Sequence, residues 1–421
     1  MAKRQGIVIS CGVVAAMHLW PAVGSSAEGL SHDHAVEVAL ATAPGLQAQH
    51  AAIDSAQAQS ISAGRLPDPE LLVGVDNLPI AGREAYSFDR DFMTMKKIGV
   101  MQSFPNRRKR SMERERAQAA VGLAEQRTQQ LQLEVARSVS QAWFSVQAAE
   151  ALERSLVDLK VELTLAAEAA RAALASARGS AVDALAAQAG VSELEDRLLQ
   201  ARAQTRAARA ELAQWIGDSA TQPLSDAPDI RELPFTREQI LASLHQHASL
   251  RTIDQELAVA RSEVELARAQ KRPDWSAQLA YAQRGGAFSD MVSFEFRVGL
   301  PLFARNRQDP MIRARRADLA QLEAERGSGL RMHAAEVARE LAAWESARER
   351  IDLYQRDRLP LARERARASQ ASYRAGEIAL TEVLASFVAE AELRRDHTTL
   401  LNELAQAWAF LRYLESPEDR P

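Results

Sequence analysis

Residues 106–177 constrain this chain more than any other stretch, because their apolar positions recur at every third or fourth residue. The stretch holds no proline and one central glycine, Gly122. This period predicts a single amphipathic helix, which at 1.5 Å per residue would be roughly 100 Å long. Such a helix must bury its apolar stripe against neighbours, so we expect coiled-coil or helical-barrel packing.

A second copy of the same pattern follows at an offset of about 200 residues, which predicts two similar structural units. The first unit, 28–217, is predicted to hold short helices, a β-hairpin over 69–104, the long helix over 106–177 and a return helix over 182–216. The second unit, 236–415, is predicted to hold short helices, a β-hairpin over 273–303, a long helix over 310–374 and a return helix over 380–414. A linker, 218–235, joins the units, and 416–421 form a tail.

Pro360 distinguishes the second long helix from the first. Proline removes a helical hydrogen bond, and its ring clashes with the carbonyl four residues earlier. We therefore expect a kink in the second long helix at this residue.

The two predicted hairpins alternate between apolar and polar residues, most clearly from Met291 to Phe303. They also hold ten of the 22 aromatic residues of the chain. An apolar face with aromatic ends opposite a polar face is typical of a transmembrane β-barrel. Four strands leave two open edges, so a barrel can close only if copies pool strands; two copies give eight and three give twelve. The alternative is a soluble periplasmic coiled-coil scaffold with β inserts, which would explain neither the aromatic strands nor the N-terminus.

The N-terminus, residues 1–27, is typical of a secretory signal peptide: Lys3 and Arg4 precede an apolar run, and Ser25-Ser26-Ala27 offers a cleavage site. An uncleaved anchor helix and a lipoprotein signal ending at Cys11 are the alternatives. Ordinary cleavage would remove Cys11, the only cysteine, and leave nothing to oxidise in an oxidising compartment.

Composition and motifs exclude several functions. The net charge of −4 gives no basic surface for nucleic acid, and no apolar run of twenty residues follows the N-terminus. We find no nucleophile–base set, phosphate-binding loop or zinc motif, so we expect neither an enzyme nor a cofactor.

The chain resembles the TolC-type outer-membrane factors of tripartite efflux and type I secretion systems. The likeness covers essentially the whole mature chain and depends on the duplicated helix, hairpin and long-helix pattern and on two turns, 177–183 and 373–384. It implies a mostly α fold with a small β part: a long α-helical barrel plus four transmembrane strands per chain, closing as a 12-stranded barrel in a homotrimer. It also implies a place in the outer membrane of a Gram-negative cell, extending into the periplasm.

The two turns resemble the periplasmic tips of the family, where the channel is gated and meets a membrane-fusion adaptor that leads to an inner-membrane RND pump. The residues that match are Gly179, Asp183, Tyr373, Gly376 and Glu382. By resemblance, Asp183 and Tyr373 help to hold the tips closed, and Glu382 belongs to an acidic ring at the constriction. Asp183 and Glu382 equally suit helix N-terminal capping. The first turn is shorter than in the family, and Ala385 stands at the second acidic position.

Three segments resemble the heavy-metal efflux (Czc/Cus-like) branch: 65–69, 91–97 together with 101–102, and 301–310. We therefore expect an exit duct for heavy-metal cations, in contact with outer-membrane lipid. A channel for drug efflux or type I protein secretion is the alternative.

Other candidates for metal binding are weaker. His32 and His34 are two residues apart, and so are His245 and His247. Two histidines at this spacing can bind one metal ion on a strand or loop, but in a helix their side chains point in different directions. Met93, Met95 and Met101 would share one strand face as soft ligands.

The cluster Arg107-Arg108-Lys109-Arg110 follows the first hairpin. It could contact lipid headgroups or simply begin a solvated helix.

Overall fold

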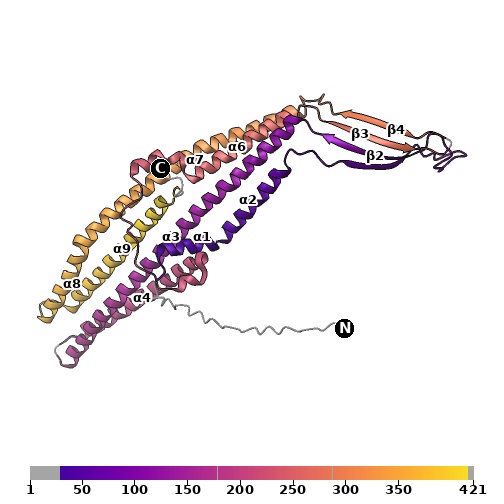
Figure 1. Ribbon diagram of the computed structural model, residues 1–421. Helices are drawn as coiled ribbons and strands as arrows, with labels where there is room; N and C mark the ends of the chain where they lie inside the picture. Colours follow the sequence, from indigo (N-terminus) through magenta and orange to yellow (C-terminus); the bar gives the residue numbers. More distant parts are fainter. Residues whose placement is uncertain (1–28, 178, 287, 416–421) are drawn as a thin grey trace, which may run out of the picture.

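The structure is a computed structural model that describes residues 29–177, 179–286 and 288–415. The predicted leader with Cys11, the tail over 416–421, and Arg178 in the first turn lie outside these residues. Long helices run side by side along an elongated molecule, and a small sheet projects from one end (Figure 1). A search of the described residues finds no helical segment with the length and hydropathy of a transmembrane span.

In the first unit, polar side chains at three helix starts accept backbone N–H groups: Ser31 before α1, Asn106 before α3 and Ser180 before α4. Such N-caps satisfy donors that have no partner within the helix. The elements are α1 (His32–Thr42), α2 (Pro44–Ser62), β1 (Glu70–Asp76), β2 (Met95–Phe104), α3 (Arg107–Ala175) and α4 (Ala181–Ile216). A short 3₁₀ turn, Gly217–Thr221, follows α4.

In the second unit, Thr236 and Gln239 form a reciprocal capping box at the start of α5. The elements are α5 (Arg237–Ala242), a 3₁₀ turn (Leu244–Gln246), α6 (Ala248–Ala269), β3 (Trp275–Gln283), β4 (Met291–Val298), α7 (Gln308–Leu353), α8 (Leu359–Arg374) and α9 (Leu380–Arg412).

The four strands form one antiparallel sheet in the order β1-β2-β3-β4. The β2–β3 ladder joins the two units, and the rings of Phe104 and Trp275 stack across it at 4.0 Å. The alternation through Phe303 predicted a longer last strand, but β4 ends at Val298. Beyond it, Gly299 donates its N–H to the carbonyl of Asp274, and Pro301 has no N–H to offer a ladder.

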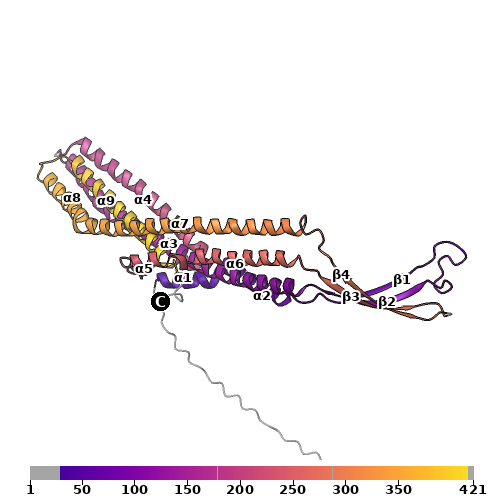
Figure 2. The ribbon, with the colours of Figure 1, turned by 90° about the horizontal axis from the view of Figure 1, so that it is seen from above.

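The second long helix bends where Pro360 predicted a kink. A π-helical turn, Tyr354–Arg358, separates α7 from α8, whose second residue is Pro360. The wider turn lies over Arg356, the residue whose carbonyl the proline ring would strike in an α-helix. Figure 2 shows the resulting change of direction between α7 and α8.

The long helices are the scaffold on which the shorter ones pack. α2 lies along the half of α3 nearer the sheet and α4 along the other half (Figure 1). At mid-length, Trp143 is fully buried and donates its indole N–H to the carbonyl of Leu30 at 3.1 Å. Trp344 donates equivalently to Ile230 at 3.0 Å. Each long helix thus fixes the segment that leads into its own unit.

Candidate functional site: sheet faces and helix tips

The sheet has one continuous apolar face that is exposed to solvent in the single chain. The register places Val73, Ile98, Tyr281 and Val292 in one row across all four strands. Val73 is 75% exposed and Phe294, two residues beyond Val292, is 72% exposed. Exposed apolar area this continuous marks a surface that meets lipid or protein.

The opposite face is polar. One of its rows crosses the sheet through Glu70, Met101, Gln278 and Glu295. Arg297 on this face pairs with Glu295 and donates to the side-chain oxygen of Gln278 at 3.4 Å. An apolar face and a charged face on the same strands fit a wall between lipid and water.

The predicted methionine stripe is only partly correct. Met95 and Met101 share the polar face, but Met93 precedes β2 and lies in the loop. Met101 lies 3.9 Å, sulfur to nitrogen, from the guanidinium of Arg297. The methionines therefore do not gather into a set of soft ligands within one chain.

Both outer strands have an unpaired edge in the described chain, since β1 pairs with β2 alone and β4 with β3 alone. An open edge exposes backbone N–H and C=O groups that another strand can satisfy. The strand directions alternate along the sheet, so β4 of one copy would meet β1 of another in antiparallel orientation.

The first tip joins α3 to α4. Ala177 adopts a left-handed φ of 55°, and its N–H donates to the carbonyl of Leu174 at 3.0 Å. Gly179 donates to the carbonyl of Ala173. A Cβ on Gly179 would lie 2.9 Å from the Cβ of Ala173, so the turn closes because residue 179 is glycine.

The second tip joins α8 to α9 and closes with the Schellman pattern of bonds. Gly376, at φ +79°, donates to the carbonyl of Tyr373 at 2.9 Å, and Glu377 donates to Ser372 at 2.9 Å. The two tips are equivalent turns in the repeat, with glycine at the left-handed position in one and Ala177 in the other.

The α3–α4 tip and the α8–α9 tip lie at the same end of the molecule, remote from the sheet (Figure 1). All five residues predicted from the sequence belong to these tips or to the first turns of the helices that follow them. The four helices there share one apolar cluster, which Tyr373 packs against. An ion pair of 3.6 Å between Arg197 and Glu392 also joins α4 to α9. Asp183 and Tyr373 form no hydrogen bond with each other in the described chain.

Asp183 and Glu382 both lie in the first turn of a helix, but neither is the N-cap. Ser180 caps α4 with its hydroxyl, and Ala379 precedes α9 without a side-chain cap. Among the described residues the two carboxylates have no side-chain bond, so capping by hydrogen bonds does not explain them. Their charge still complements the positive end of the helix dipole.

A groove of about 540 Å³ lies between α3, α8 and α9 near the tips, and Tyr373 lines it. On its wall Glu390 is only 4% exposed, pairs with Arg394 and lies 3.8 Å from Arg363. The sequence did not single out Glu390, because its i, i+4 pair with Arg394 is also the pattern of an ordinary solvated helix face.

The two histidine pairs do not chelate. His32 is buried, lies 2.7 Å from the hydroxyl of Ser140, and has its pKa lowered by burial, whereas His34 is exposed. The described residues contain no group of three His, Cys, Asp or Glu side chains able to hold a metal ion.

His247 contacts His333 of α7, whereas the sequence paired it with His245. Nδ1 of His247 lies 2.5 Å from Nε2 of His333, and its Nε2 lies 3.4 Å from the carboxylate of Glu415. Burial, reinforced by the two neighbouring histidines, lowers the pKa of His247 to about 4. Desolvation of this ring, which is 1% exposed, is the largest of these causes.

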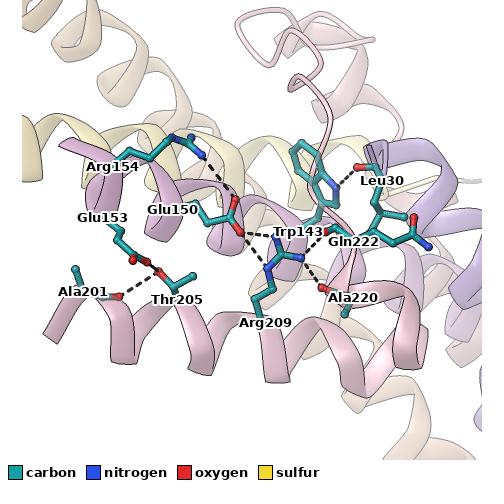
Figure 3. A network of polar contacts seen from close by, with 10 residues as sticks. All are labelled: Leu30, Trp143, Glu150, Glu153, Arg154, Ala201, Thr205, Arg209, Ala220 and Gln222. Carbon is teal, nitrogen blue, oxygen red and sulfur yellow. Dashed lines mark hydrogen bonds and ion pairs between the residues drawn. The ribbon is translucent and has the colours of Figure 1, made fainter. Parts of the chain in front are cut away.

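A polar network fixes the segment after α4 (Figure 3). Arg209 of α4 pairs with Glu150 of α3 and donates to the carbonyls of Ala220 and Gln222. The guanidinium thus joins both helices of the first tip hairpin to the start of the linker.

The duplicated helices, the four-stranded sheet and the paired tips define a protein class. The family model described as "Outer membrane efflux protein" matches residues 35–218 and 240–414, one match in each unit. This chain therefore belongs to the outer membrane efflux protein family, and we place it in the Gram-negative outer membrane, extending into the periplasm.

Several solved structures share the fold. CusC is 17% identical with a TM-score of 0.78, and the match covers 95% of this chain and 96% of that one. VceC of Vibrio cholerae is 18% identical with a TM-score of 0.76, covering 91% and 95%. CmeC of Campylobacter jejuni is 14% identical with a TM-score of 0.77, covering 92% and 87%. A comparison with curated protein sequences found no match.

Proposed function

We propose that three copies of this chain form the exit duct of a tripartite RND-type efflux system, and that the duct passes substrate without chemistry of its own. The observation that carries this proposal is the open four-stranded sheet with one apolar and one polar face. In lipid, unpaired strand edges are untenable, so the strands must close between copies. Twelve strands would enclose a lumen lined by the polar face.

The helical end would receive the substrate. Its tips are remote from the sheet, and the groove near Tyr373 offers a half-enclosed surface for a helical partner. We propose that a periplasmic membrane-fusion adaptor binds there and links the duct to an inner-membrane pump.

Gating is proposed for the tips. Replacing Asp183 by Ala together with Tyr373 by Phe should increase leak through the isolated channel, because both side chains lie where the tips of three copies would converge. Conductance in planar lipid bilayers measures this. Glu377→Ala, at an exposed position of the second tip, is the matched control. Equal conductance in the double variant and the parent would count against a gating role for the pair.

For the substrate we propose heavy-metal cations, on the strength of the three segments that resemble the heavy-metal branch. Drug export is the second candidate, because the family match indicates an efflux protein without naming its substrate. A deletion strain challenged with metal salts, antibiotics and bile salts separates the two. Sensitivity confined to Cu, Ag, Zn, Co or Cd supports metal export. Sensitivity to drugs and detergents alone would leave the exit-duct proposal intact and contradict the assignment of metal cations as its substrate.

A further inference from the structure

All four junctions between helices and strands lie together at one end of the sheet (Figures 1 and 2). Each junction contributes at least one exposed arginine. These arginines, called here the basic belt, are Arg65 after α2, Arg107 after β2, Arg272 after α6, and Arg305 and Arg307 after β4.

Three other cations at the junctions are already paired. Arg108 lies 3.4 Å from Glu265, Lys109 lies 3.3 Å from Asp274, and Lys271 pairs with Asp309. In the basic cluster 107–110, the second and third residues thus hold α3 against the second unit. The exposed Arg107 and the partly buried Arg110 have no ion pair in the described chain.

Within the described chain, no arginine of the basic belt has an ion pair. Arg65 donates through Nε to the carbonyl of Ile61, which leaves its two terminal nitrogens available. Among the described residues, Asp68 and Glu70 in the α2–β1 junction and Glu113 beside Arg65 have no ion pair. Five arginines thus face three unpaired carboxylates, and each chain presents an excess of positive charge here. That excess would be tripled around a closed barrel.

Large apolar side chains lie beside the basic belt on the sheet side. Leu302 and Phe303 are 76% and 77% exposed, and Leu66 and Leu300 are also exposed. Trp275 begins β3 at the same level and is 40% exposed. Apolar groups on one side and cations on the other match the boundary between acyl chains and headgroups.

The opposite end of the sheet carries charges of both signs. Arg83 and Arg90 are exposed there, but Glu84, Asp89 and Asp91 accompany them, and Asp89 pairs with Lys96. The excess of positive charge is therefore a property of the helix-side end alone.

We propose that the basic belt binds the phosphates of anionic phospholipids in the leaflet that faces the periplasm. The inference rests on the placement of the sheet in the outer membrane. A guanidinium matches phosphate oxygens with two parallel N–H donors, which favours arginine for this contact. The belt would fix how deeply the sheet sits and would leave the helices free of the bilayer.

Trp275 makes the proposal measurable. Trp275 lies in a strand, whereas the other tryptophans of the described chain lie in helices: Trp143, Trp215, Trp344 and Trp408. The full chain is reconstituted in phosphatidylcholine vesicles that contain a fixed share of brominated phosphatidylglycerol or, in parallel, of brominated phosphatidylcholine. Bromine quenches the fluorescence of an indole that it touches, and a Trp275→Phe variant supplies the background.

Brominated phosphatidylglycerol should associate with Trp275 about three- to tenfold more strongly than brominated phosphatidylcholine, and high salt should weaken the preference. The triple variant Arg272→Gln, Arg305→Gln, Arg307→Gln should bring the ratio close to one. Arg83→Gln with Arg90→Gln, which removes two exposed arginines at the other end, should leave it unchanged.

Equal quenching by both lipids in the parent chain would overturn the basic belt while leaving the membrane placement intact. An equal loss of preference in the Arg83/Arg90 control would also overturn it, since overall charge would then explain the effect. Absence of quenching by either lipid would refute the membrane placement, and the proposal with it.

Discussion

The buried pair of His247 and His333 should make the junction between α6, α7 and the end of α9 sensitive to acid. His247 is neutral in the fold, with a pKa of about 4, and titrates near 6.5 when unfolded. Between these values the unfolded chain binds the proton and the folded chain does not. Stability is therefore complete above pH 6.5, falls as the pH drops, and stops falling below about 4.

The magnitude follows from the difference between the two pKa values. Lowering the pKa of His247 from 6.5 to about 4 corresponds to about 3 kcal/mol of unfolding free energy in total, of which about 2 kcal/mol is already lost at pH 5. The other titratable or charged groups that face the pair are His245, Glu336, Glu415 and Arg137.

The test compares His247→Asn with the parent chain by denaturant unfolding at pH 8 and pH 5. The parent should lose about 2 kcal/mol more than the variant between the two pH values. His34→Asn, at an exposed position of α1, should behave like the parent. The same loss of stability in parent and His247→Asn would refute the reasoning.

Two further predictions concern the helical end. Arg209→Ala removes the guanidinium that donates to Glu150 and to two carbonyls. It should lower the free energy of unfolding by about 2–4 kcal/mol in denaturant titrations. The control Arg202→Ala, at a more exposed ion pair, should lower it by less than about 1 kcal/mol. Equal losses would contradict the network in Figure 3. Gly376 has φ +79° and Ala177 has φ +55°, a region that favours glycine over alanine. Gly376→Ala should therefore lower the free energy of local opening at its tip by about 1 kcal/mol and speed hydrogen exchange there. Ala177→Gly should raise the free energy of opening at the other tip by about 1 kcal/mol and slow exchange. Changes of the same sign would refute the left-handed assignment.

The sequence predicted the features of the fold that depend on local periodicity. The helix period of 107–175 and the alternation of β4 follow from where apolar residues recur, so element type and sheet face could be predicted. Pro360 predicted a kink for the same reason, since its clash with the preceding turn is local. The predicted end of β4 at Phe303 was wrong, because the alternation continues past Val298 into residues that form turns instead of ladder pairs.

Features that depend on packing between distant segments could not be predicted. His247 meets His333, 86 residues away, and the spacing of His245 and His247 suggested a different pair. The groove beside Glu390 and the basic belt likewise arise only when several helices or junctions are brought together. The tip residues could be placed from the sequence because each tip is a local turn, but their roles in gating remain predictions.

The central claim is that strands of three copies close one barrel, and cross-linking the sheet edges tests it most directly. In a chain with Cys11→Ser, Val73→Cys on β1 and Phe294→Cys on β4 place one thiol near each open edge, on the same face. Within one chain three strand spacings, about 14 Å, separate the edges, so a bismaleimide of about 8 Å reaches only between copies. In native outer membranes we expect covalent dimers and trimers and nothing larger. Monomers alone, or a ladder continuing beyond three copies, would contradict a closed trimeric barrel.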